Sequence, residues 1–255
     1  MIRLSALQMQ TAGPDTAANL ARIETAALEA ARAGATLLVT PELGVTSYGG
    51  GDKITDLAEP ADGAIVARLA KIARETGVAL VGGFVEKAGD AVYNSAIYTD
   101  GRGKPSVYRK SHLYGEYERN LFTPEMPSTC LFSHRGMTLA MLICYDVEFP
   151  ENVRRLARAG AELILVPTAT PKGVSGTFIA EKMIPVRAFE NQIFIAYVNN
   201  VGKDGDFDYA GRSVIAGPDG TVLASAGLTE ELLTTDIEPN LFARSRSENT
   251  YLTDL

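Results

Sequence analysis

The stretch Leu139-Ala140-Met141-Leu142-Ile143-Cys144-Tyr145-Asp146 places a cysteine directly after a wholly apolar run. This run, with Thr138 before it, has the length and composition of a buried β-strand. Two other apolar runs, Leu37-Leu38-Val39-Thr40 and residues 163–167, also indicate buried strands. Amphipathic helical patterns, such as the Ala-rich residues 19–33 and the predicted helix 177–191, alternate with these strands. The alternation predicts an α/β fold, built as a mixed sheet or as two sheets stacked face to face with helices outside.

Hairpins add antiparallel strands to this pattern. Residues 79–85 and 91–98 are strand-like and are separated by residues 86–90, while Gly217-Pro218-Asp219-Gly220 is a hairpin turn between two more strands. No Pro/Ser-rich linker, block of like charge or internal repeat interrupts the chain. We therefore expect residues 1–255 to form a single domain.

The composition is ordinary for a globular protein. Of the 255 residues, 46% are hydrophobic and 22% are charged. The net charge of −7 argues against a nucleic-acid partner and against an anionic membrane surface. The N-terminus lacks the apolar run of a signal peptide, and no segment approaches the ~20 apolar residues of a membrane helix. These features predict a cytoplasmic protein.

Cysteine and histidine are both scarce. Cys130 and Cys144 are the only cysteines, and His112 and His134 are the only histidines. Two isolated cysteines form neither a metal-ligand pair nor a disulfide framework. So few histidines make a Ser-His-Asp triad or a His-based metal site hard to assemble. We therefore predict no metal and no cofactor, a packing role for Cys130, and structural hydrogen bonds for the two histidines.

Three polar residues follow predicted strands at the point where each strand ends. Glu42 follows the run 37–40, Lys110 follows a strand that reaches Tyr108, and Cys144 follows the apolar run quoted above. Strand ends that converge at one rim of a sheet are where α/β proteins place their sites. A carboxylate, an ammonium and a thiol gathered there supply a base, an electrostatic stabiliser and a nucleophile. Acyl transfer requires these groups.

The three segments also resemble the Glu-Lys-Cys signatures of the nitrilase (carbon–nitrogen hydrolase) superfamily, in order and in local context. The resemblance covers nearly the whole chain, because further segments match between and after them: Tyr93-Asn94-Ser95, Gly115-Glu116-Tyr117-Glu118, Val166-Pro167-Thr168-Ala169 and Arg187-Ala188-Phe189-Glu190-Asn191-Gln192. It implies a four-layer α-β-β-α sandwich whose subunits associate as a homodimer or a larger homo-oligomer.

The resemblance also implies a role for each residue. Glu42 is expected to act as the general base, and Cys144 as the nucleophile that forms a thioester while ammonia leaves. Lys110 is expected to stabilise the tetrahedral oxyanion together with the backbone N–H of Tyr145. Glu118 resembles the additional glutamate of the family, although Glu116 lies two residues away and could exchange roles with it.

The substrate prediction rests on the residues that follow the nucleophile. Members of the family that hold a substrate carboxylate carry arginine where this chain has Val147 and Glu148, and Glu148 would repel such a group. The segments around Cys144 and Glu118, and the C-terminal run 251–255, most resemble aliphatic amidases of the 5-aminopentanamidase type and stereoselective amino-acid amidases. We therefore predict an amidase that cleaves small linear amides, not peptide bonds, including amine-bearing ones. The residues expected to contact the substrate are Tyr48, Tyr145, Glu148 and Thr168.

Two alternatives remain open on the sequence alone. The same three residues could serve a nitrilase, because attack on a small nitrile gives a thioimidate at the same cysteine. The chain could also be a catalytically silent binding protein on the same fold. The presence of Glu42, Lys110 and Cys144 together argues against the second alternative.

Overall fold

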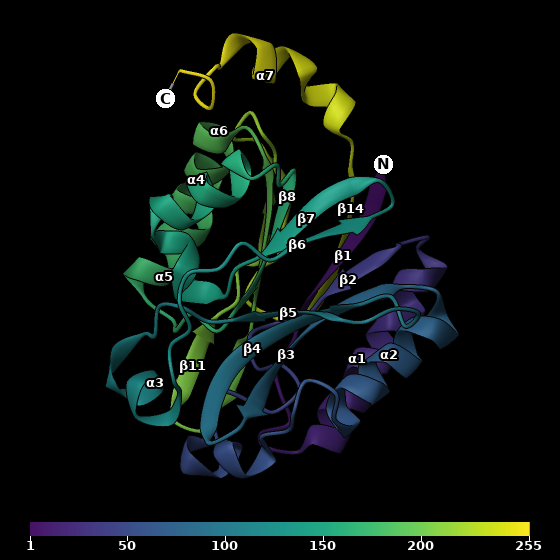
Figure 1. Ribbon diagram of the computed structural model, residues 1–255, viewed down its shortest axis with the longest axis vertical. Coiled ribbons are helices and arrows are strands. Elements are labelled where there is room, and N and C mark those ends of the chain that lie inside the picture. Colours follow the sequence, from purple (N-terminus) through teal and green to yellow (C-terminus); the bar gives the residue numbers. More distant parts are fainter. Residues whose placement is uncertain (255) are drawn as a thin grey trace.

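Two six-stranded sheets form the centre of the computed structural model, which describes residues 1–254 (Figure 1). In the first sheet, β1, β2 and β3 run parallel, while the other three strands pair antiparallel to their neighbours. Its strands, in spatial order, are β14 (Glu231–Ile237), β1 (Ile2–Gln8), β2 (Leu37–Val39), β3 (Ala79–Ala88), β4 (Ala91–Thr99) and β5 (Ser106–Arg109).

The second sheet repeats this plan, with three parallel strands flanked by antiparallel ones. Its strands, in spatial order, are β13 (Val222–Ser225), β12 (Val214–Ala216), β9 (Phe194–Asn199), β8 (Leu163–Thr168), β7 (Met137–Met141) and β6 (Leu131–His134). A separate two-stranded ribbon consists of β10 (Val201–Asp204) and β11 (Phe207–Ala210).

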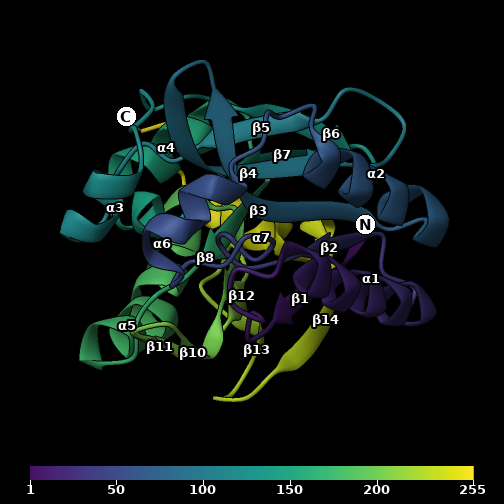
Figure 2. The same ribbon diagram turned by 90° about the horizontal axis from the view of Figure 1, so that it is seen from below.

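Helices cover the outer face of each sheet (Figures 1 and 2). On the first sheet lie α1 (Thr16–Arg32) and α2 (Ala64–Thr76), and on the second lie α4 (Pro150–Arg158) and α6 (Ile184–Asn191). The Asp15 side chain accepts a hydrogen bond from the Ala18 N–H and caps α1. Helix α2 ends at Gly77, whose φ of 72° is left-handed. The remaining helices are α3 (Gly115–Leu121), α5 (Val174–Phe178) and α7 (Ala243–Glu248).

The buried side chains on the two faces of the first sheet belong to separate clusters. Leu4 and Val39 of the first sheet share one apolar cluster with Leu139 and Ile164 of the second sheet. Outward-facing residues of the first sheet, such as Leu38, instead belong to a cluster shared with α1 and α2. The predicted four-layer sandwich is therefore confirmed, and the stacked pair of sheets is the correct choice of the two arrangements that the sequence left open.

Several elements differ from their sequence-based predictions. The predicted helix 177–191 is part of a longer segment, in which a π-helical turn (Ile179–Met183) separates α5 from α6. The turn between β3 and β4 is shorter than predicted, because β3 continues to Ala88. Strands β6, β10, β11 and β14 and helix α3 were not predicted as elements.

The chain after β14 crosses an end of the sandwich to reach α6 (Figure 1). There Phe242 packs edge-on against Phe194, and Tyr251 packs against Phe189. Leu255, the last residue of the C-terminal run 251–255, lies outside the described residues. Among residues 1–254, no helix combines the length and the hydropathy needed to cross a bilayer.

Candidate active site

Cys144 lies on a sharp turn between β7 and a short 3-10 helix (Cys144–Glu148). Its φ is 44°, a left-handed value that is costly for a residue other than glycine, asparagine or aspartate. The preceding Ile143 is extended, so the chain reverses its course at the cysteine. The first N–H groups of a helix have no intrahelical acceptor, which leaves the Tyr145 N–H available to a ligand. This strand–turn–helix geometry presents both a thiol and a hydrogen-bond donor at the end of β7.

Asp146 joins this turn to the loop that carries Lys110. Its buried carboxylate accepts hydrogen bonds from the Tyr108 hydroxyl, the Ser111 hydroxyl and the His112 N–H, each at 2.9 Å. Tyr108 and Ser111 flank Lys110 on β5 and the residues that follow it. Asp146 therefore fixes the ammonium-bearing loop against the nucleophile turn, a role that the sequence did not reveal.

Lys110 is fully buried between two carboxylates. Its Nζ lies 2.7 Å from Oε1 of Glu42 and 2.6 Å from Oε1 of Glu118. Burial lowers the pKa of Lys110, but the adjacent carboxylates of Glu118 and Glu42 raise that pKa further, to well above its ordinary value. The side chain is therefore a fixed cation at neutral pH.

Glu42 keeps one carboxylate oxygen free. Oε1 accepts hydrogen bonds from Lys110 and, at 2.8 Å, from the Asn94 side-chain amide. Oε2 is buried and has no hydrogen-bond partner among residues 1–254. Burial raises the pKa of Glu42 to about 6, against the lowering effect of Lys110. At neutral pH Glu42 is therefore ionised and offers Oε2 as a base.

Glu118 occupies the other side of the ammonium. Its Oε1 also accepts the Tyr48 hydroxyl at 2.8 Å, and its Oε2 accepts the Tyr114 N–H at 2.7 Å. Glu118 is fully buried, whereas Glu116 points to solvent. The structure therefore brings Glu118, and not Glu116, to Lys110.

Cys144 is 8% exposed, and the environment of its thiol disfavours the ionised form. Burial raises the pKa of Cys144 well above its usual value, and the Glu42 charge raises it further against the opposing effect of Lys110. The thiol is therefore protonated at neutral pH while Glu42 is ionised. A base must remove the thiol proton before attack, and the nearby carboxylate can do so.

A cavity of about 430 Å³ opens onto these groups. Cys144 and Glu118 line it, together with Tyr48, Tyr145 and Glu148 from the predicted substrate-binding set. Thr168 does not line it, because its side chain is buried and its hydroxyl donates to the Val166 carbonyl at 2.9 Å. Thr170, two residues later, lines the cavity instead. Among residues 1–254, no group of His, Cys, Asp and Glu side chains is arranged to hold a metal ion.

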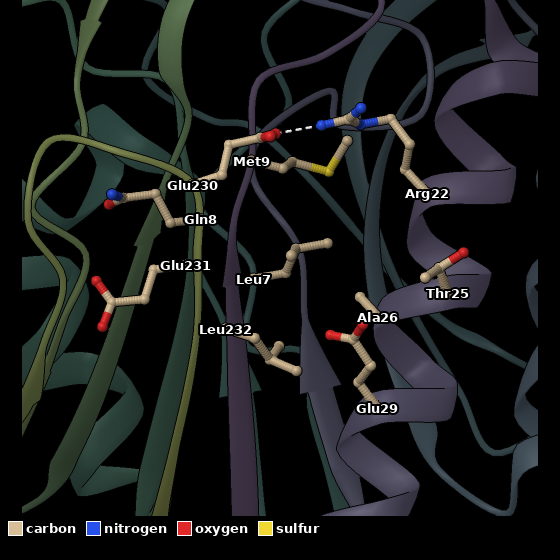
Figure 3. Close-up of a pocket in the computed structure, with 10 residues that line it drawn as sticks. All are labelled: Leu7, Gln8, Met9, Arg22, Thr25, Ala26, Glu29, Glu230, Glu231 and Leu232. Carbon is tan, nitrogen blue, oxygen red and sulfur yellow. Dashed lines mark hydrogen bonds and ion pairs between the residues drawn. The ribbon is translucent and has the colours of Figure 1, made fainter.

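A second cavity, of about 350 Å³, lies between α1 and the strands β1 and β14 (Figure 3). Its side chains include an ion pair of Arg22 with Glu230, and an apolar floor that contains Leu7 and Leu232. None of the predicted site residues lines it, and it contains no cysteine. Of these two cavities, only the one at Cys144 contains the groups that acyl transfer requires.

Known proteins with similar sequences agree with this site. The carbon–nitrogen hydrolase family profile matches residues 3–246. The chain is 35% identical to an (R)-stereoselective amidase from Pseudomonas sp. over 99% of this chain and 91% of that protein. It is also 35% identical to a nitrilase from Pyrococcus abyssi, over 91% of this chain and 87% of that protein.

The solved structures include an amidase from Nesterenkonia sp. AN1. A variant of that amidase in which a cysteine is replaced by alanine, in complex with butyramide, superposes with a TM-score of 0.86 at 34% identity, covering 100% of this chain and 94% of that one. Another variant carries the acetamide moiety of fluoroacetamide attached covalently to its active-site cysteine, with a TM-score of 0.84, 33% identity and coverage of 100% and 97%. By family match and by fold, this chain belongs to the carbon–nitrogen hydrolase family, among the amidases of the nitrilase superfamily.

Proposed function

We propose that this chain hydrolyses small aliphatic carboxamides to the acid and ammonia, with Cys144 as the nucleophile and Glu42 as the base. One observation carries the assignment of roles: Oε2 of Glu42 is buried, ionised at neutral pH and without a partner among residues 1–254, close enough to Cys144 to raise the pKa of its thiol. The family relatives that hydrolyse amides support the reaction type.

The reaction begins with proton transfer from Sγ of Cys144 to Oε2 of Glu42. The thiolate attacks the amide carbon, and the oxyanion that forms is stabilised by Lys110 and the Tyr145 N–H. Glu42 returns its proton to the nitrogen, the C–N bond breaks, ammonia leaves and a thioester remains. Glu42 then deprotonates a water molecule that attacks the thioester, which releases the acid and restores the thiol.

The charge of the cavity favours an amine-bearing amide. Glu148 lines the cavity, and burial raises the pKa of its carboxyl. Lys172 lines the same cavity, but its exposed ammonium lies 3.3 Å from Asp208 and pairs with that carboxylate. The charges of Lys110 and Arg187 also act on Glu148, but Lys110 is held by two other carboxylates and Arg187 pairs with Glu190. A substrate ammonium could therefore pair with Glu148. Glu116 is exposed and does not line the cavity, so it contributes no such preference.

We expect kcat/KM to be higher for 5-aminopentanamide than for pentanamide, measured by ammonia release. In the Glu148→Gln variant, the ratio of kcat/KM for 5-aminopentanamide to kcat/KM for pentanamide should be about fivefold lower than in the wild type. This factor corresponds to the loss of one partly exposed ion pair of ~1 kcal/mol. Glu116→Gln is the matched control and should keep the wild-type ratio. Equal values for the two amides in the wild type would remove the charge preference. Faster ammonia release from pentanenitrile than from either amide would favour a nitrilase, which the similarity to the Pyrococcus protein makes the second candidate.

We also propose that copies of the chain associate in a reducing cytoplasm, which would keep the Cys144 thiol available. The continuous helical segment 174–191 exposes Val174, Phe178 and Val186, whose exposed fractions are 89%, 55% and 52%. Exposed apolar side chains grouped on one element are typical of an interface.

Light scattering should give a molar mass of about twice the 27.2 kDa chain mass or more for the wild type, and a smaller molar mass for the Phe178→Ser variant. Leu228→Ser, an exposed apolar residue elsewhere, should leave the mass unchanged. A monomer at micromolar concentration would contradict the proposal.

A further inference from the structure

Two hydroxyl groups lie behind the Cys144 thiol and have no part in the reaction described above. Oγ1 of Thr170 lies 3.7 Å from Sγ of Cys144, within hydrogen-bond distance for sulfur. The Tyr197 hydroxyl forms a short hydrogen bond with the same Oγ1. Thr170 is 7% exposed, at the cavity wall, and Tyr197 is 1% exposed, so both residues are buried. The thiol therefore sits at the end of a buried chain of two hydroxyls.

The direction of these hydrogen bonds follows from the need to satisfy buried donors. Among residues 1–254, the Tyr197 hydroxyl has only Thr170 as a hydrogen-bond partner. If Thr170 donated to Tyr197, the buried Tyr197 proton would have no acceptor, which is costly. If Tyr197 donates to Thr170, the Thr170 proton is free to point at sulfur and both donors are used. The second arrangement directs a proton at Sγ.

The backbone of Thr170 is held in place. Its N–H donates to the Asn199 side chain at 2.9 Å, and its carbonyl accepts the Ala210 N–H at 3.0 Å. The Thr170 methyl group packs against Gly176, where an added Cβ would lie only 3.1 Å from it. A donor held this firmly needs no reorganisation when charge develops on the sulfur.

We propose that Tyr197 and Thr170 form a hydrogen-bond relay that stabilises the thiolate of Cys144. The inference rests on the proposed role of Cys144 as nucleophile and deepens it. No proton is transferred along the relay: the Cys144 proton goes to Glu42, and the two hydroxyls only donate hydrogen bonds. The relay acts when the thiolate forms and again when it leaves the thioester. Thr170 is then a catalytic residue, because it touches the reacting sulfur, and Tyr197 is a positioning residue that acts through it.

The test measures the pH dependence of alkylation of Cys144 by iodoacetamide in a Cys130→Ala background, so that one thiol reacts. We expect Thr170→Val to raise the apparent pKa of the thiol by about one unit, the effect of losing one hydrogen bond to a charged group. Tyr197→Phe should raise it by about half as much, since it only weakens the Thr170 donor. The double variant should match Thr170→Val alone. Thr170→Ser keeps the hydroxyl and should retain the wild-type value.

Thr168→Val is the matched control, because the Thr168 hydroxyl is buried nearby but donates to the Val166 carbonyl. An unchanged thiol pKa in folded Thr170→Val, or an equal shift in Thr168→Val, would overturn the relay. If Thr170→Val does not fold, Tyr197→Phe carries the test, and an unchanged pKa there overturns the relay as well. Alkylation reads the thiol without amide turnover, so a failure of the relay is distinguishable from a failure of the proposed amidase activity.

Discussion

Amide hydrolysis is expected to disappear when Cys144 is replaced by alanine, with a loss of about 10⁴-fold or more. No other cysteine reaches the cavity, so the variant has no covalent route from amide to acid. Stability should change little, because alanine keeps the Cβ and removes only one sulfur atom, at a cost of ~1 kcal/mol. Ammonia release from 5-aminopentanamide and a thermal unfolding curve of the same sample check both expectations.

Cys130→Ala is the control for this variant. Cys130 is partly buried against the core and is not among the residues that line the cavity. Its loss should leave kcat/KM close to the wild-type value, because no residue that lines the cavity is changed. Residual turnover of a folded Cys144→Ala protein at a tenth of the wild-type rate would sink the thioester mechanism. No turnover by the wild type on any amide would instead favour the silent binding protein.

The Lys110→Met variant is expected to lose activity and stability together. Methionine fills a similar volume but leaves the carboxylates of Glu42 and Glu118 buried without their cation. Removing one partner of a buried ion pair costs about 3–5 kcal/mol of unfolding free energy. The oxyanion also loses a charged donor, which is worth about 10²–10³ in kcat. Urea unfolding and amide turnover measure the two losses separately.

The stability loss in Lys110→Met should depend on pH in a defined direction. Lys110 lowers the pKa of Glu42, so its removal takes that pKa above the wild-type value of about 6. A carboxyl whose pKa is higher in the folded state than in the unfolded state favours folding below its unfolded pKa, and this contribution is lost as pH rises through the folded pKa. The deficit should therefore be smaller at pH 5 than at pH 8. Lys172→Met, at an exposed ion pair, should show neither the deficit nor its pH dependence. A Lys110→Met deficit that grew toward low pH would contradict this account.

The sequence predicted the parts of this molecule that local chemistry determines. Buried strands such as β2 and β8 are short, largely apolar runs of the kind that the sequence alone identifies. The sequence missed β14, which has exposed positions and is strand only because it pairs with β1. The π-helical turn was also missed, because one extra residue in a helix hardly alters its apolar periodicity.

The site shows the same contrast between residues that the local sequence identifies and residues that only the fold brings together. Glu42, Lys110 and Cys144 were predicted from their places after strands, and the structure brings Glu42 to Lys110 and the charge of both to bear on Cys144. Asp146 was not singled out, because its partners Tyr108 and Ser111 lie 38 and 35 residues away along the chain. Thr168 was chosen where Thr170 lines the cavity. The hydroxyl of Thr168 turns back to its own strand, and only the course of the chain beyond β8 brings Thr170 to the thiol.

Glu42 and Lys110 follow strands of the first sheet, whereas Cys144 and Thr170 follow strands of the second. The base and the nucleophile are therefore held on opposite sides of the seam where the two halves of the sandwich meet. A slide of one half past the other by about 1 Å is enough to cost ~10²-fold in rate, although the backbone hydrogen bonds within each sheet survive it. The rate of amide hydrolysis therefore depends on how the two halves of the sandwich are stacked. On warming, amide hydrolysis should therefore stop at a temperature at which both sheets are still folded.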